Sequence, residues 1–234
     1  MLRCSATRTL LIAPIVCASL AVPADASIMT YSDPAVWAAL VMPGFSTVNF
    51  EGLASAGVPG NFSDSSGLTL SGIQFIGLTP PGSYYLLVQD AATATKYAWG
   101  SGDTLEGPNS AWQPANPGYI QANLPAGTTA FAAYVMTHNG SAKTPGSVTV
   151  SIPATGDTAP ISTSASARTF IGVVSDAPIL SARFQPTSAS TYLLLDDFSA
   201  GQAAEPTPES ETLFLGGSGL LGLWIARCLR RWAT

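Results

Sequence analysis

The chain has 234 residues, of which 47% are hydrophobic and 10% charged, and its formal net charge at pH 7 is −5. A chain of this size can bury one sizeable core. Between residues 27 and 204 acidic residues outnumber basic ones, which argues against binding to the phosphate backbone of a nucleic acid. The basic residues of that segment are Lys96, Lys143, Arg168 and Arg183.

Residues 1–26 have the features of a secretory signal peptide. Arg3 and Arg8 supply a positively charged start, and an apolar run follows from residue 10 to 22. Ala24-Asp25-Ala26 places small residues at the positions that a signal peptidase reads, so we predict cleavage after Ala26. The run is shorter than the roughly 20 residues that span a bilayer. The sequence therefore predicts an exported domain over residues 27–204.

The exported domain is expected to begin with a short helix. Asp33 is suited to cap the helix and Pro34 to occupy its first position. Trp37 and Leu40, three residues apart, are expected to share a face, and Pro43-Gly44 to end the helix.

Beyond this helix the pattern changes to short apolar runs separated by turn residues. All three cysteines, Cys4, Cys17 and Cys228, lie outside the domain, so its stability cannot come from an internal disulfide. Many short strands and tight turns indicate a mainly β fold, a single jelly-roll-like β-sandwich. We predict strands over residues 46–50, 68–76, 84–88, 119–124, 130–136, 147–152, 168–174, 179–185 and 192–198.

The span from residue 91 to 117 is predicted to be a long loop on the rim of the sandwich. Loops of this kind often carry binding residues. Trp99 and Trp112 lie within it, and aromatic rings commonly stack on the apolar faces of sugars. They are therefore candidate ligand-binding residues, although tryptophans that anchor the loop would give the same pattern.

The domain shows little sign of catalytic chemistry, and we predict no catalytic residues. His138 is its only histidine, and its place beside Asn139-Gly140 is more typical of a solvated loop residue. Asp196 and Asp197 are adjacent on a predicted strand, so their side chains should point to opposite faces and cannot form a glycosidase pair alone. With Glu51 they could instead hold a structural Ca²⁺, although ordinary surface carboxylates would look the same.

The C-terminal residues 205–234 have the features of a membrane anchor. A proline-rich linker leads to residues 212–226, which hold no charged residue, and Arg227, Arg230 and Arg231 follow. An uncharged apolar stretch followed by a basic cluster predicts a transmembrane helix with its C-terminus in the cytoplasm. That orientation agrees with an exported domain and predicts a location in the cell envelope.

This tail resembles the bacterial PEP-CTERM sorting signal, which has a short Pro-Glu-Pro motif, a Gly/Leu-rich helix and a basic end. Pro208 and Glu209 match the first two positions of the motif, and Ser210 stands where the second proline is usual. The resemblance implies processing by an exosortase, a membrane cysteine protease that cuts near the motif, after signal peptidase has removed residues 1–26.

The domain also resembles the extracytoplasmic β domains often found ahead of such tails. The matching phrases are Asn49-Phe50-Glu51-Gly52, Leu124-Pro125-Ala126-Gly127 before Ala130-Phe131, residues 170–176, and Leu195-Asp196-Asp197-Phe198. Three hypotheses follow. The preferred one is a non-catalytic, exosortase-sorted envelope protein with a structural or adhesive role in extracellular polysaccharide or a biofilm matrix. The alternative is a carbohydrate-binding module on the cell surface, and the least favoured is an enzyme acting on polysaccharide.

Overall fold

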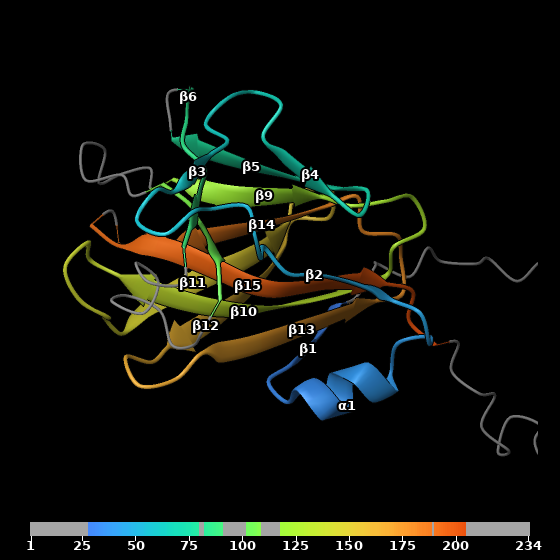
Figure 1. Ribbon diagram of the computed structural model, residues 1–234. Coiled ribbons are helices and arrows are strands. Elements are labelled where there is room, and N and C mark those ends of the chain that lie inside the picture. Colours follow the sequence, from blue (N-terminus) through green and yellow to red (C-terminus); the bar gives the residue numbers. More distant parts are fainter. Residues whose placement is uncertain (1–27, 80–81, 91–101, 109–117, 189, 205–234) are drawn as a thin grey trace, which may run out of the picture.

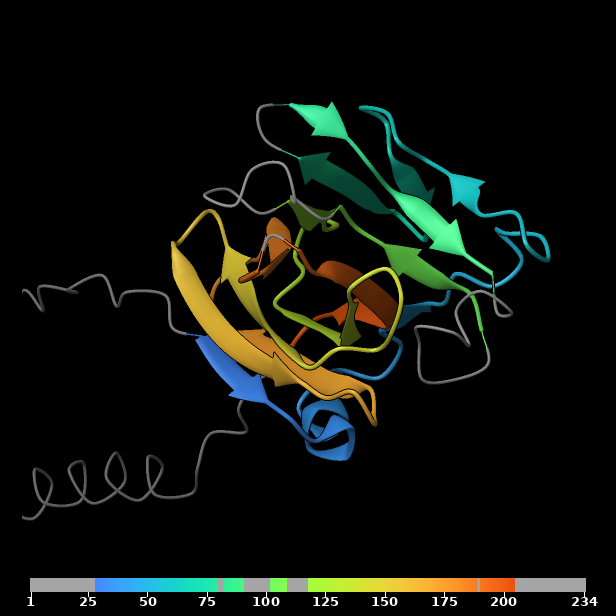
Figure 2. The ribbon, with the colours of Figure 1, turned by 90° about the vertical axis from the view of Figure 1, so that its left-hand side faces the viewer.

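The computed structural model describes residues 28–79, 82–90, 102–108, 118–188 and 190–204. These residues form a mainly β structure of two antiparallel sheets packed face to face, as the sequence predicted (Figures 1 and 2). The first sheet has the order β1-β13-β10-β15-β8-β7-β3, and β2 also pairs with β15. The second has the order β12-β11-β14-β9-β5-β4, and β6 pairs with β5.

The strands of the first sheet come from both ends of the domain, so residues distant in sequence become neighbours. In spatial order these strands are β1 (Ile28–Tyr31), β13 (Thr169–Ser175), β10 (Ala130–His138), β15 (Tyr192–Gly201), β8 (Thr104–Glu106), β7 (Leu87–Gln89) and β3 (Gly60–Asn61), with β2 (Ser46–Val48) beside β15. In the second sheet they are β12 (Asp157–Thr163), β11 (Gly146–Ile152), β14 (Ser181–Pro186), β9 (Tyr119–Asn123), β5 (Ile73–Thr79) and β4 (Leu68–Leu70), with β6 (Ser83–Tyr84) beside β5.

The core between the sheets is built around phenylalanine rings. Phe198 on β15 stacks on Phe131 of β10, with centroids 6.1 Å apart, and meets Phe75 of β5 edge to face at 5.2 Å. Phe184 on β14 also contacts Phe198, at 6.1 Å. All four rings are fully buried and come from both sheets, so this cluster holds the two layers together.

The predicted helix is confirmed as α1 (Pro34–Ala39). The Asp33 side chain accepts hydrogen bonds from the backbone N–H groups of Ala35 and Val36, which satisfies donors at the helix start. Trp37 packs on the outer face of the first sheet, where a Cβ at Gly172 would lie 2.3 Å from its ring. Leu40 does not share that buried face, because it is 37% exposed.

Several predicted strand boundaries are wrong for identifiable reasons. The run 68–76 is two strands, β4 and β5, because Ser71 and Gly72 adopt positive φ angles and reverse the chain. Residues 84–88 likewise divide between β6 and β7. Strand β12 was not predicted because it contains Pro160, which is tolerated there since β12 lies at the edge of its sheet.

Candidate functional site

The outer face of the second sheet presents polar side chains in regular rows. Along β9, Ile120 and Ala122 point into the core, so Tyr119, Gln121 and Asn123 point outward. The strand register places Gln74 of β5 opposite Asn123 and Arg183 of β14 opposite Gln121. Strands β5, β9 and β14 lie side by side (Figure 1). They thus bring together residues as far apart in the sequence as Gln74 and Arg183.

These side chains form a continuous chain of hydrogen bonds with one direction. Arg183 Nη2 donates to Gln121 Oε1 at 3.1 Å, and Gln121 Nε2 donates to Asn123 Oδ1 at 2.8 Å. Asn123 Nδ2 donates to Gln74 Oε1 at 2.9 Å, and Gln74 Nε2 donates to the Ser66 carbonyl at 2.8 Å. We call Gln74, Gln121 and Asn123 the amide ladder. The bonds fix which way each amide faces, since reversing one would oppose two donors or two acceptors.

The amide ladder leaves hydrogen-bonding capacity unused. A side-chain amide has two N–H donors and an oxygen with two lone pairs, and the ladder uses one donor and one acceptor site of each. Beside it, the Tyr119 ring lies under the Arg183 guanidinium, whose Cζ is 4.0 Å from the ring centroid. The result is a rigid surface that offers donors, acceptors and one aromatic ring.

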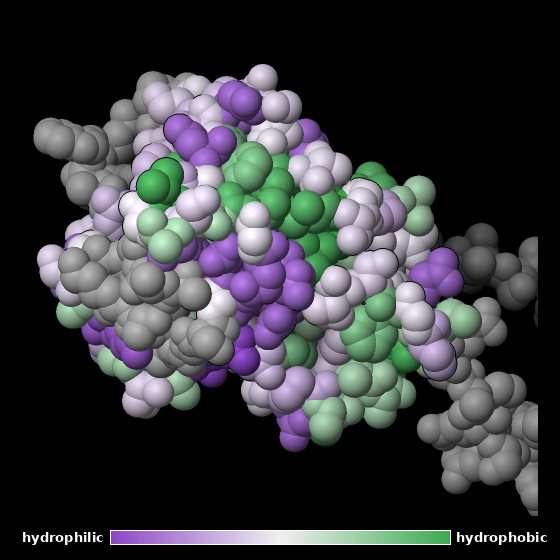
Figure 3. All heavy atoms as spheres, in the orientation of Figure 1, coloured by the Kyte–Doolittle hydropathy of each residue, from purple (hydrophilic) through white to green (hydrophobic). Residues whose placement is uncertain are grey.

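The first sheet places Asp196 and Asp197 differently from the sequence prediction. The pairing of β15 with β10 shifts between Ala132 and Tyr134, and Asp197 has a φ of 46°, which marks a β-bulge. Both carboxylates consequently reach the same cation: Arg168 Nη1 donates to Asp196 at 2.8 Å and to Asp197 at 3.0 Å. The expectation that the two side chains point to opposite faces is wrong. Figure 3 shows a hydrophilic patch over β15 on this side.

Burial raises the pKa of the Asp196 carboxyl above its ordinary 3.8, and the charge of Asp197 adds to the rise, while Arg168 opposes it. The folded chain therefore binds this proton more tightly than the unfolded chain, so this group lowers stability as pH rises through its pKa.

We expect Arg168→Met to raise the pKa of Asp196 further. Unfolding by urea at about pH 4 and pH 7 should show a steeper loss of stability in Arg168→Met than in the native chain. Arg168→Lys keeps the charge and should behave more like the native chain; equal pH slopes for Arg168→Met and native protein would contradict this account.

A second polar cluster on the first sheet surrounds the buried carboxylate of Glu106. Tyr85 donates its hydroxyl to Glu106 Oε1 at 2.7 Å, and Gln89 Nε2 donates to Oε2 at 3.0 Å. His138 Nε2 lies 3.2 Å from the same Oε2. Because the Gly140 N–H donates to His138 Nδ1, the hydrogen of this ring sits on Nε2 and points at Glu106. We call Tyr85, Gln89, Glu106 and His138 the Glu106 cluster.

The Glu106 cluster corrects two sequence predictions. His138 is not a solvated loop residue: it ends β10, is 2% exposed and stacks on Tyr192 with centroids 4.9 Å apart. The predicted loop over residues 91–117 also contains strand β8, which adds Glu106 to the first sheet beside β15 and β7. The side chains of the Glu106 cluster form their hydrogen bonds with one another, which fits a structural role for the cluster.

The three residues predicted to hold calcium do not form a cluster. Glu51 accepts a hydrogen bond from the Asp103 N–H, while Asp196 and Asp197 bind Arg168. Among the residues that the structure describes, no group of three or more His, Cys, Asp or Glu side chains could hold a metal ion. These observations give no support to a calcium site at Glu51, Asp196 and Asp197, and the predicted Ca²⁺ remains untested.

The other predicted site residues lie outside the described residues. These are Trp99 and Trp112, the motif Pro208, Glu209 and Ser210, and the basic residues Arg227, Arg230 and Arg231. The predicted membrane segment 212–226 falls there as well. Within the described ranges, no helix is long and apolar enough to cross a bilayer.

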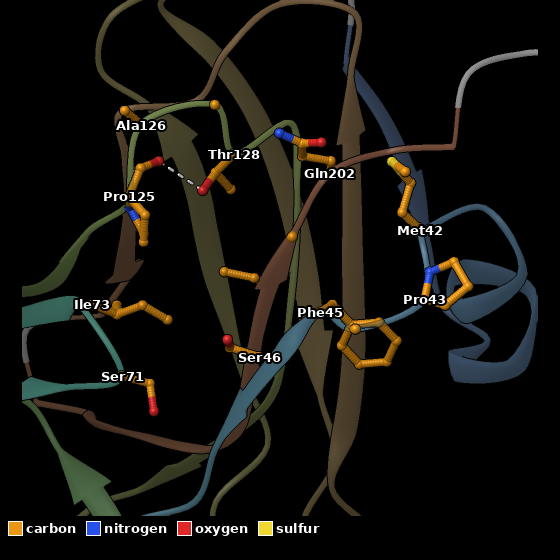
Figure 4. Close-up of a pocket in the computed structure, with 14 residues that line it drawn as sticks. Met42, Pro43, Phe45, Ser46, Ser71, Ile73, Pro125, Ala126, Thr128 and Gln202 are labelled. Carbon is orange, nitrogen blue, oxygen red and sulfur yellow. Dashed lines mark hydrogen bonds between the residues drawn. The ribbon is translucent and has the colours of Figure 1, made fainter.

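A pocket of about 310 Å³ opens at one end of the sandwich, between β2 and β15 of the first sheet and the β4–β5 turn of the second (Figure 4). Met42, Phe45, Ile73 and Pro125 give it an apolar lining, and its polar groups are uncharged side chains such as Thr128. Thr128 donates its hydroxyl to the Pro125 carbonyl at 2.8 Å. The lining has no acid or base, so the pocket offers contact area without acid–base chemistry.

Comparisons with known proteins give a distant likeness only. No family model matches the sequence, and no match was found among curated proteins. The CBM22-1–GH10 modules of Clostridium thermocellum endo-1,4-β-D-xylanase 10B, complexed with xylohexaose, match with 12% identity and a TM-score of 0.35 over 57% of this chain and 27% of that one. The chain thus spans about a quarter of that structure's length. TmCBM61 in complex with β-1,4-galactotriose matches with 12% identity and a TM-score of 0.29, over 61% of this chain and 98% of that one.

Proposed function

We propose that this chain is an exported, non-catalytic protein that binds carbohydrate on the outer face of its second sheet. The observation that carries the proposal is the amide ladder, in which Gln74, Asn123 and Gln121 are held in fixed orientations beside the Tyr119 ring. The ladder lies on the outer face of the sheet and is built from two neighbouring strands, β5 and β9, with Arg183 of β14 beside it.

The chemistry of this surface suits a sugar. Sugar hydroxyls need donors and acceptors in defined directions, and the free amide positions supply both. Because the ladder fixes these groups before a ligand arrives, little side-chain entropy is lost on binding. Tyr119 adds an aromatic ring at one end of the ladder.

We expect Gln121→Leu to weaken binding to a soluble polysaccharide about tenfold, because it removes the central member of the ladder while keeping similar volume. Tyr119→Leu should have a similar effect. Both can be measured on a glycan array and then by calorimetry with the full chain in a mild detergent.

Tyr134→Leu is the matched control, because Tyr134 also carries a guanidinium, that of Arg168 at 4.3 Å, but on the first sheet. Its affinity should equal that of the native chain.

Trp99→Ala and Trp112→Ala test the loop residues predicted from sequence. Loss of binding with these two changes and none with Gln121→Leu would move the site to the loop and reject the ladder.

We further propose that the protein is carried to the cell envelope, held there by residues 212–226 and processed by an exosortase at Pro208-Glu209-Ser210. There it would hold extracellular polysaccharide, an adhesive role that needs binding but no catalysis. We also propose that the strands of the exported domain are connected as in a jelly roll and that the domain binds a structural Ca²⁺. The sorting step is tested with Glu209→Ala: processed product should fall and membrane-bound precursor accumulate, whereas unchanged processing would reject the motif.

A further inference from the structure

The guanidinium of Arg183 is fixed in place, and no carboxylate among the described residues pairs with it. Gln121 accepts a hydrogen bond from Arg183 Nη2, and the Tyr119 ring supports the guanidinium from one face. Arg168, on the first sheet, has instead two carboxylates at 2.8 and 3.0 Å. Within the described part of the chain, no carboxylate lies within 4 Å of Arg183.

Arg183 also has donors to spare. A guanidinium has five N–H donors, and here Nε is buried without any hydrogen-bond acceptor among the described residues. Because Nε is inaccessible, a ligand of this guanidinium would be bound through its terminal nitrogens Nη1 and Nη2. Arg prefers planar anions such as carboxylates, which it can bind through two parallel hydrogen bonds.

The charge distribution of the second sheet makes this position unusual. Its strands contain two charged residues, Arg183 and Asp157. Asp157 lies on the edge strand β12 and accepts a hydrogen bond from Thr155. Asp64 lies near the far end of the ladder, where it binds Ser66 and Gly67. An acidic protein therefore has, on the outer face of its second sheet, one positive charge that no carboxylate of the described residues pairs with, beside the amide ladder.

We propose that the carbohydrate bound by the second sheet is acidic, a polysaccharide of uronic acid residues whose carboxylate is bound by Arg183. The amide ladder and Tyr119 bind the hydroxyls and ring of the sugar. This inference rests on the proposed function and specifies the class of its ligand. A neutral glycan would leave the guanidinium unpaired in the complex.

The test compares two probes that share one backbone: polygalacturonate and its fully methyl-esterified form, which has no carboxylate. Calorimetry uses the full chain in a mild detergent, as native protein and as Arg183→Gln, Arg183→Lys and Lys143→Gln. Lys143→Gln is the matched control, since it removes one positive charge near the far end of β10, at the bridge to His138. Thermal unfolding of each variant confirms that it is folded.

We expect the native chain to prefer polygalacturonate. Arg183→Gln should reduce that affinity about 10- to 100-fold, because a charge-assisted hydrogen bond is lost, and leave binding of the ester unchanged. Arg183→Lys should be intermediate, and Lys143→Gln should be close to native. Added salt should weaken native binding more than binding by Arg183→Gln.

Two other results would overturn the proposal and can be told apart. If the native chain binds both probes equally, Arg183→Gln changes neither affinity, and Gln121→Leu still weakens both, the acidic ligand is wrong and the carbohydrate site stands. If the native chain binds neither these probes nor any glycan on the array, the carbohydrate function itself is wrong.

Discussion

Replacing Phe198 by alanine is expected to lower the free energy of unfolding by about 3 to 5 kcal/mol. Phe198 is fully buried and contacts Phe131, Phe75 and Phe184, so its loss leaves a cavity where the two sheets meet. Domains of this kind are stable by only about 5 to 15 kcal/mol, so one such change removes a large fraction of the total. Urea unfolding followed by tryptophan fluorescence measures the difference.

Phe198→Leu is the comparison variant, because leucine keeps much of the volume and should cost clearly less than alanine. It also gives a measurable protein if Phe198→Ala does not fold. A cost below about 1 kcal/mol for Phe198→Ala would show that the rings do not join the sheets as described.

Replacing Glu106 by alanine is expected to destabilise the domain by a similar amount, about 3 to 5 kcal/mol. The change removes the acceptor that Tyr85, Gln89 and His138 share, and the donor groups of Gln89 and His138 are buried. Leaving a buried donor unsatisfied costs about 1 to 3 kcal/mol per group. Denaturant unfolding at neutral pH is again the measurement.

Glu106→Gln separates this effect from simple loss of volume. Its amide oxygen can still accept from Gln89 and His138, while its NH₂ can donate to the Tyr85 hydroxyl. We therefore expect Glu106→Gln to retain most of the stability. Equal losses for alanine and glutamine would mean that the hydrogen bonds contribute little and that only packing matters.

Strands whose residues alternate between core and surface, or form a longer apolar run, could be predicted from the sequence. Along β11 the buried residues Val148, Val150 and Ile152 follow period two, and β9 and β14 show the same alternation. Strand β8 escaped prediction because it has only three residues and ends in Glu106, a residue type depleted in strands. Its burial depends on partners from β7, β10 and the segment around Tyr85, which a local pattern cannot contain.

The site shows the same limit. The alternation of Tyr119, Gln121 and Asn123 along β9 could have placed half of it on one face. Gln74 and Arg183 lie beside these residues only because β5 and β14 pair with β9 in a particular register. The sequence pattern alone does not give that register. Likewise, the bulge at Asp197 turns two adjacent aspartates toward one arginine, against the simple rule of alternation.

The most direct test of carbohydrate binding by the second sheet is an NMR titration of the full chain with oligogalacturonate, observing side-chain amide groups. We predict that the NH₂ signals of Gln121 and Asn123 shift as the sugar is added. The NH₂ signal of Gln89, bound to Glu106 on the first sheet, should stay in place. Shifts confined to Gln89 and its neighbours, or no shift in the ladder at saturating sugar, would contradict the account.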